Sequence, residues 1–278
     1  MACPQLSKPN NINSVTGGEV SAPNTITGIT EPATSLSNAR IGYNNLLAAT
    51  TTAAAQVMLI PNTYERYKPG AGAKTVKYQL SQLSAVDFVG IAAHNAGSEG
   101  VSITVQYAST IGGALTTIDT INFSDNSANM LLFTEVQAAE IALVFTSTAN
   151  LELGVIYAGK ALEMQRPMYG GLSPIDLSGV TEYQSVDSDT GQFLGRTITR
   201  KGLESSFSWK HLADDWVRSD FMPFVESARK LPFFIKWRPD YYDSSVFGRS
   251  TADIKPANMG GGHRLMSVSF NMRGHQDI

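Results

Sequence analysis

Residues 69–75, which read Pro-Gly-Ala-Gly-Ala-Lys-Thr, come nearest in this chain to a phosphate-binding loop. A P-loop has one glycine directly before its lysine and another five residues earlier, because its backbone amides must approach the phosphates closely. Ala73 and Lys68 stand at those two positions, and no strand-to-helix pattern surrounds the segment. We therefore interpret it as a turn.

Two aspartates could begin a calcium loop. Asp187 and Asp189 precede Gly191, as in the first half of such a loop. The twelfth position of the loop needs a bidentate glutamate, and Ile198 stands there instead. The residues between two apolar runs favour a hairpin turn.

Paired carboxylates for glycoside hydrolysis are the next candidates. Asp214 with Asp215, and Asp240 with Asp243, are neighbours in the sequence. Glycosidase carboxylates flank the substrate at roughly 5 to 9 Å from each other, which sequence neighbours rarely do. We interpret both pairs as helix-cap and turn residues.

Nucleophiles and metal ligands are sparse. Cys3 is the only cysteine, and no Gly-x-Ser-x-Gly elbow occurs. The histidines are scattered without His-x-x-x-His spacing: His94, His211, His263 and His275. The sequence therefore predicts a protein that is not an enzyme and has no catalytic residue, metal or cofactor.

Charge and hydropathy exclude two kinds of partner. The net charge is −3, and no basic run exceeds two residues, as at Arg200-Lys201. A nucleic-acid partner needs a stronger positive field. No stretch of about 18 apolar residues occurs, so we expect no membrane insertion.

The distribution of charge along the chain indicates where one domain ends and the next begins. Residues 1–162 hold 7 Lys/Arg and 10 Asp/Glu, whereas residues 163–278 hold 14 of each. All three tryptophans lie in the second part, after a Pro/Gly-rich stretch typical of a linker. We predict an extended N-terminal arm (1–38), a β-sandwich of the jelly-roll kind (39–162), a linker (163–174) and a β-rich α+β domain (175–278).

The arm carries four prolines and three charged residues and has no apolar periodicity. A disordered tail is one interpretation. The other is an arm that lies on a neighbouring subunit, because few charges would have to be desolvated.

Short apolar and β-branched runs separated by Gly, Asn and Asp predict strands in residues 39–162. Val101, Ile103, Val105 and Tyr107 alternate with polar residues and should share one face. The predicted strands are residues 86–94, 101–107, 116–123, 130–135, 140–147 and 151–158. Such spacing is typical of a sandwich or jelly roll.

The last 104 residues combine strands with a helical pattern. Residues 179–184, 192–200, 203–211, 232–239 and 264–272 are predicted strands. Apolar residues recur at three-to-four-residue spacing between 214 and 230, where Pro223 predicts a kink or two short helices. Seven aromatic residues should form the core: Trp209, Trp216, Phe221, Phe224, Phe233, Phe234 and Trp237.

Residues 87–95 (DFVGIAAHN) and 101–109 (VSITVQYAS) resemble the central strands of discoidin-like jelly rolls found in phage tail and other virion proteins. Such jelly rolls often bind carbohydrate at loops on one end. The resemblance therefore implies Tyr64, Tyr67 and Tyr107 as candidate sugar contacts. A packed tyrosine is the interpretation that the sequence favours, since residues 38–162 contain no tryptophan platform.

The order GRTITR (195–200), SWKHL (208–212), PFFIKWRP (232–239) and MSVSFNMRG (266–274) resembles the C-terminal part of tailed-phage virion proteins. This resemblance implies a structural subunit of the tail or neck, assembled in the host cytoplasm. Its partners would be further copies of itself and other virion proteins. The sparse charge of residues 1–162 predicts a symmetric oligomer in which the arm and the first domain supply much of the contact surface. A tail adhesin module that binds a host-surface glycan is the alternative, and a depolymerase is the least favoured hypothesis.

Overall fold

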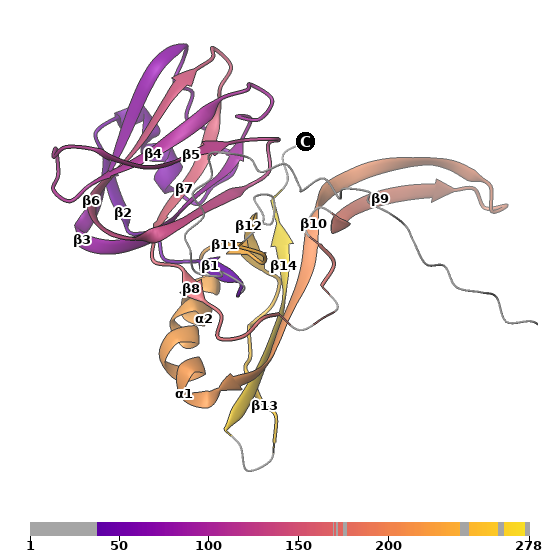
Figure 1. Ribbon diagram of the computed structural model, residues 1–278. Helices are drawn as coiled ribbons and strands as arrows, with labels where there is room; N and C mark the ends of the chain where they lie inside the picture. Colours follow the sequence, from indigo (N-terminus) through magenta and orange to yellow (C-terminus); the bar gives the residue numbers. More distant parts are fainter. Residues whose placement is uncertain are drawn as a thin grey trace, which may run out of the picture. The chain divides into compact units, whose positions relative to one another are not determined.

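The computed structural model describes residues 38–168, 170, 172–174, 177–239, 245–260 and 264–275. The predicted arm, apart from Asn38, lies outside these residues, as do Cys3, His263, Asp240 and Asp243. The described chain is mainly β, with two antiparallel sheets and one interrupted helix, which confirms the predicted fold class (Figure 1).

The first sheet belongs to the predicted jelly roll. Its strand order is β2-β3-β6-β4-β5, and β7 also pairs with β3. The strands are β2 (Leu47–Thr50), β3 (Gly72–His94), β4 (Ser102–Ala108), β5 (Thr116–Asn122), β6 (Asn129–Ser147) and β7 (Leu153–Gly159), and a 3₁₀ helix, η1 (Ala53–Leu59), follows β2.

Two long strands fold this sheet back on itself. β3 and β6 pair from Gly72↔Ser147 to Ile91↔Asn129, with a register shift between Gln79 and Ser84. A bulge of this kind lets strands turn a corner and continue in a second layer. The predicted strands 130–135 and 140–147 are therefore one strand, β6, and β3 begins 14 residues before the predicted strand 86–94.

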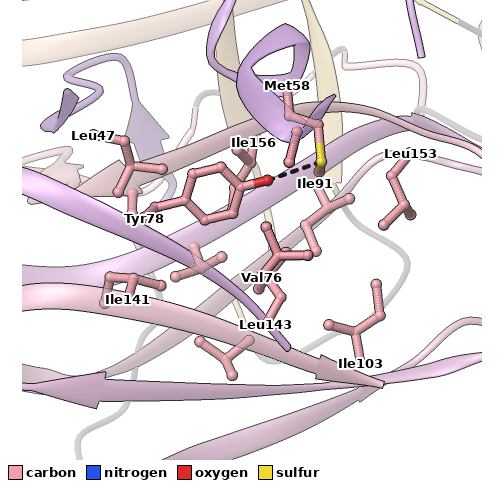
Figure 2. Packing of buried hydrophobic residues seen from close by; sticks show 14 of the residues in the cluster. Leu47, Met58, Val76, Tyr78, Ile91, Ile103, Ile141, Leu143, Leu153 and Ile156 are labelled. Atoms are coloured by element: carbon pink, nitrogen blue, oxygen red, sulfur yellow. Dashed lines mark hydrogen bonds between the residues drawn. The ribbon is translucent and has the colours of Figure 1, made fainter. Parts of the chain in front are cut away.

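Side chains from both layers fill the jelly-roll core (Figure 2). Val101, Ile103 and Val105 are buried there, and Tyr107 packs against the cluster, as the alternation predicted. The buried hydroxyl of Tyr78 donates to Met58 Sδ at 2.9 Å, so η1 is fastened to β3 through a satisfied polar group.

The second sheet has the order β8-β1-β11-β12-β14-β10-β9, with β13 paired to β14. Its strands are β1 (Arg40–Gly42), β8 (Leu162–Glu163), β9 (Gly179–Asp187), β10 (Phe193–Ala213), β11 (Phe233–Lys236), β12 (Ser245–Ser250), β13 (Ala257–Asn258) and β14 (Leu265–Gly274). β1 and β8 flank the jelly roll in sequence, yet they join this sheet.

The predicted helix spans three segments: α1 (Asp214–Trp216), the π-helical turn η3 (Val217–Phe221) and α2 (Met222–Ala228). Pro223 stands two positions after the end of the π turn, and Phe221 and Met222 before it keep helical backbone angles, so the helix continues past the proline. The sequence thus predicted the interruption, and the π turn is how the chain accommodates it. No helix within the described ranges is long and apolar enough to cross a membrane.

Strand alternation divides the aromatic residues of the second sheet between its two faces. Phe233 and Ile235 of β11 pack with Trp209, Phe224 and neighbouring residues beneath the helix. Trp216 and Trp237 are only partly buried at the edge of this cluster, so they contribute less to it than predicted.

Phe234 departs from the prediction, because it points to the opposite face. It packs with Phe88 and Tyr157 of the jelly roll and with Phe247 of β12. Lys236, two residues along the same strand, donates from Nζ to the Met130 carbonyl at 3.2 Å. The two sheets therefore share a buried cluster, and a chain division at residues 162–174 stays a prediction.

Candidate functional site

The most exposed structured element is the hairpin of β9 and β10 (Figure 1). β10 pairs with β14 from Leu203 to Ala213 and with β9 from Phe193 to Leu203. Beyond Leu203 the two strands therefore have only each other among the described residues. This part of the hairpin is a two-stranded ribbon with both edges free to pair.

The hairpin arises from its turn sequence. Ser188 N–H donates to the Gln192 carbonyl and Gly191 N–H to the Ser188 carbonyl, each at 2.8 Å. Gly191 has a φ of +80°, a conformation that favours glycine. The predicted hairpin turn at residues 187–191 is confirmed.

Large apolar side chains are concentrated on this ribbon. Every residue of β9 is exposed. The exposed apolar residues of the hairpin are Val180, Tyr183, Val186, Phe193, Leu194 and Ile198, and Phe193 and Leu194 reach 64% and 65% exposure. Tyr183 and its partner Ile198 lie on one face of the ribbon, and Val180 and Val186 lie on the other, so apolar side chains are exposed on both faces. So many exposed apolar side chains on one element indicate an interaction surface, whereas isolated exposed apolar residues do not.

Local contacts shape the ribbon without burying it. The Arg196 guanidinium lies over the Tyr183 ring at 3.8 Å from its centroid, and its Nε donates to Ser185 Oγ at 3.1 Å. At the base, Glu182 accepts from Arg200 at 3.2 Å and from Arg273 at 3.1 Å. Exposed pairs of this kind contribute about 0–1 kcal/mol each.

Such a ribbon is marginally stable by itself in water. Its backbone edges offer unpaired N–H and C=O groups, and exposed edges of this kind pair readily with another chain. The sequence predicted both strands but not this exposure. An alternating apolar pattern looks the same in a strand buried by its own chain and in one that a partner covers.

The three predicted sugar-contact tyrosines do not converge. Tyr64 is 91% exposed, in a turn where its N–H donates to Asn62 Oδ1 at 2.9 Å. Tyr67 is buried and bridges Leu153 through its backbone. Tyr107 is half-buried and pairs with Ile141 of β6. The loop that carries Tyr67 enters β3 at Gly72, which pairs with Ser147, six positions along β6 from Ile141.

The other candidates occupy structural positions. The imidazole of buried His94 accepts from Ala96 N–H at Nδ1 and packs on Phe123 at 4.4 Å between ring centroids. Asp214, in the first helical turn, pairs with Arg218 at 2.9 Å. Residues 69–75 lead into a strand instead of a helix: Gly72–Thr75 already belong to β3, so the predicted turn is limited to the bend before it, where Gly70 and Gly72 have positive φ. The described residues contain no cluster of three or more His, Cys, Asp or Glu side chains that could hold a metal.

No protein-family model and no curated protein matches the chain. Solved structures that resemble part of it include a pectin-binding carbohydrate-binding module (16% identity, TM-score 0.37, covering 42% of this chain and 93% of that one). Another is chitosan-binding module 1 of a chitosanase/glucanase from Paenibacillus sp. IK-5 (16%, 0.36, 43% and 98%).

A third is a CBM32 module of Clostridium perfringens bound to GalNAc-β-1,3-galactose (13% identity, TM-score 0.35, covering 44% of this chain and 99% of that one). At these identities and TM-scores the likeness carries no argument about what this chain binds. The three named proteins are carbohydrate-binding modules, and the comparisons give no support to the resemblance to tailed-phage proteins, which rests on sequence patterns.

Proposed function

We propose that this protein is a non-enzymatic structural subunit that assembles with other copies of itself through the β9–β10 hairpin. The observation that supports this proposal is the ribbon itself, which exposes six large apolar side chains and, beyond Leu203, has two edges that pair with no other described residue. A protein that worked as a monomer would expose a surface prone to aggregation.

The magnitudes support association but not through apolar contact alone. Fully burying a large apolar side chain gains about 1.5–3 kcal/mol, and these side chains are already roughly half covered. Covering all six would therefore gain roughly 5–9 kcal/mol. Association costs about 4–15 kcal/mol, so strand pairing along a free edge or charge contacts must add to the interface.

We further propose that this subunit lies in the tail or neck of a tailed phage. It is supported by the four sequence patterns of the C-terminal part and by the sparse charge of residues 1–162, which hold 17 charged side chains. Interfaces are depleted in charge in this way. Electron microscopy of particles labelled at the C-terminus tests the location, and label absent from purified particles would contradict it.

Assembly is tested by replacing residues 181–201 with Asn-Gly, which closes the Val180–Gly202 pair with a two-residue turn. We expect the full chain to form a discrete oligomer in sedimentation velocity and the replaced chain to remain a monomer with an unchanged Tm. Phe193→Ser should weaken association, whereas Ile111→Ser, at a similarly exposed loop residue, should not. An oligomer that survives the replacement contradicts the proposal.

Carbohydrate binding is the second candidate, and one observation favours it. Tyr64 presents an almost fully exposed ring on a turn whose backbone is hydrogen-bonded, and Glu152 holds Arg66 and Lys68 in the same loop at 3.7 and 2.5 Å. An aromatic face beside fixed polar groups can stack on a sugar ring. Glycan-array binding that Tyr64→Ala removes would support this function, and no binding by the full chain would exclude it for the glycans arrayed.

A further inference from the structure

A wide groove lies at the base of the hairpin, where β10 leaves the sheet. Its volume is about 900 Å³, and it is lined by residues of β10, β12 and β14, by the loop after α2, and by Pro61 and Thr63 of the jelly roll. This volume is at the upper end of what small-ligand sites enclose, and it is large enough to admit the tip of a turn.

The groove is cationic. Five Lys or Arg residues line it together with His275 and a single carboxylate, that of Glu204: Arg200, Arg229, Lys230, Arg249 and Arg273. Nearby acids pair with three of these cations. Glu182 pairs with both Arg200 and Arg273, Glu204 pairs with Arg273, and Glu226 and Asp253 pair with Arg229.

Two cations in the groove are not neutralised. Lys230 and Arg249 are exposed, and neither forms an ion pair with a described residue. Arg249 stands directly opposite Arg273 in the β12–β14 pairing, and like charges in that position repel each other. A carboxylate brought into the groove would relieve this repulsion.

The tip of the hairpin has the complementary charge. Residues 186–194 contain Asp187 and Asp189 and no basic residue. Both carboxylates are exposed, and neither pairs with a described cation. The same tip carries the exposed side chains of Phe193 and Leu194.

A copy cannot place its own tip in its own groove. Glu182 pairs with Arg200 of the groove, and Asp187 lies five residues farther along β9. At about 3.4 Å per residue, the tip is roughly 17 Å or more beyond the groove, so it could return only if the hairpin came apart.

From the groove and the tip together, and resting on the proposed assembly through the hairpin, we infer that the tip of one copy docks in the groove of the next. Asp187 and Asp189 face Lys230 and Arg249 of the neighbouring copy. Each copy contributes one tip and one groove, so the contact is head-to-tail and closes into a ring where the rotation permits.

A charge exchange tests this contact. The first variant is Asp187→Lys with Asp189→Lys, and the second is Lys230→Glu with Arg249→Glu. Each variant alone should associate at least about tenfold more weakly than the wild type at low salt, since its tip and its groove then carry the same sign. Mixed in equal amounts, the two variants should associate again, because the tip of each then matches the groove of the other.

The matched control is Glu135→Lys with Lys160→Glu, which reverses an exposed ion pair of the jelly roll at 2.8 Å and should leave association unchanged. If both charge variants associate like the wild type while the Asn-Gly replacement is monomeric, the hairpin docks elsewhere: this inference falls and the proposed function stands. If the full chain is a monomer at every concentration, both this inference and the proposed function are refuted. Retention of that monomer on polygalacturonate, lost in the second variant, would assign the groove to an acidic glycan instead.

Discussion

The cluster shared by the two sheets predicts strong coupling between Gly90 and Phe234. A Cβ added at Gly90 would lie 2.8 Å from Cδ2 and Cε2 of the Phe234 ring and 2.9 Å from Cζ. The ring cannot easily move away, because Tyr157 lies edge-on to it at 5.6 Å and Phe247 packs against it at 4.7 Å. Gly90→Ala should therefore overpack the interface and cost about 1–3 kcal/mol.

Removing the ring should reverse the sign of that cost. Phe234→Ala is expected to cost about 3–5 kcal/mol, because it empties a fully buried position. In that background the methyl group introduced by Gly90→Ala enters vacated space, and Gly→Ala at a compatible backbone position stabilises by about 0.4–1 kcal/mol. The double-mutant cycle should then give an interaction energy of about 2 kcal/mol or more.

Urea unfolding of the wild type, the two single variants and the double variant measures this energy. Gly195→Ala is the control, since a Cβ there meets nothing within 4 Å. Additive effects within about 0.5 kcal/mol would show that the two residues are not in contact, and the shared cluster would be refuted.

Three further predictions concern the two cores and the arm. Burial raises the pKa of Tyr78 and Tyr157 above the usual value of 10.0, so the unfolded chain loses these protons first as the pH rises. Above about pH 10 the free energy of unfolding should therefore fall by up to about 1.4 kcal/mol per pH unit for each group. Tyr78→Phe should make this fall less steep, and an unchanged slope in alkaline urea titrations would argue against the burial of Tyr78. Phe224→Ala should lower Tm by roughly 6–20 °C, since the ring packs edge-on to Phe233 at 4.9 Å. Trp216→Ala should lower Tm less, because that side chain is partly exposed, and equal Tm shifts in calorimetry would contradict this order. A chain that starts at Asn38 should be excluded from particles or lose oligomer in sedimentation, and its normal incorporation would refute a role for the arm.

Local alternation could be predicted from the sequence where one face is buried by the protein's own chain. Val101, Ile103 and Val105 face the jelly-roll core, as their alternation with polar residues predicted. The hairpin turn at residues 187–191 was also predictable, because Asp, Ser and Gly have specific backbone preferences there.

Tertiary choices could not be predicted in this way. The alternation in β11 separates Phe233 from Phe234, but it does not say that both faces of the strand are covered or by what. The continuity of β3 across residues 80–83 depends on pairing with β6, which polar residues at the corner conceal. The groove joins residues more than 200 positions apart, such as Pro61 and Arg273, and no local pattern reports that proximity.

Hydrogen exchange of the full chain at dilute and at associating concentrations tests the central claim most directly, because it reports on backbone edges residue by residue. We predict that association slows exchange in residues 179–202 and in the groove segments 228–232 and 247–251, while the jelly-roll core exchanges alike in both states. Exchange of the hairpin that remains fast and unchanged in the assembled protein would contradict docking through β9 and β10.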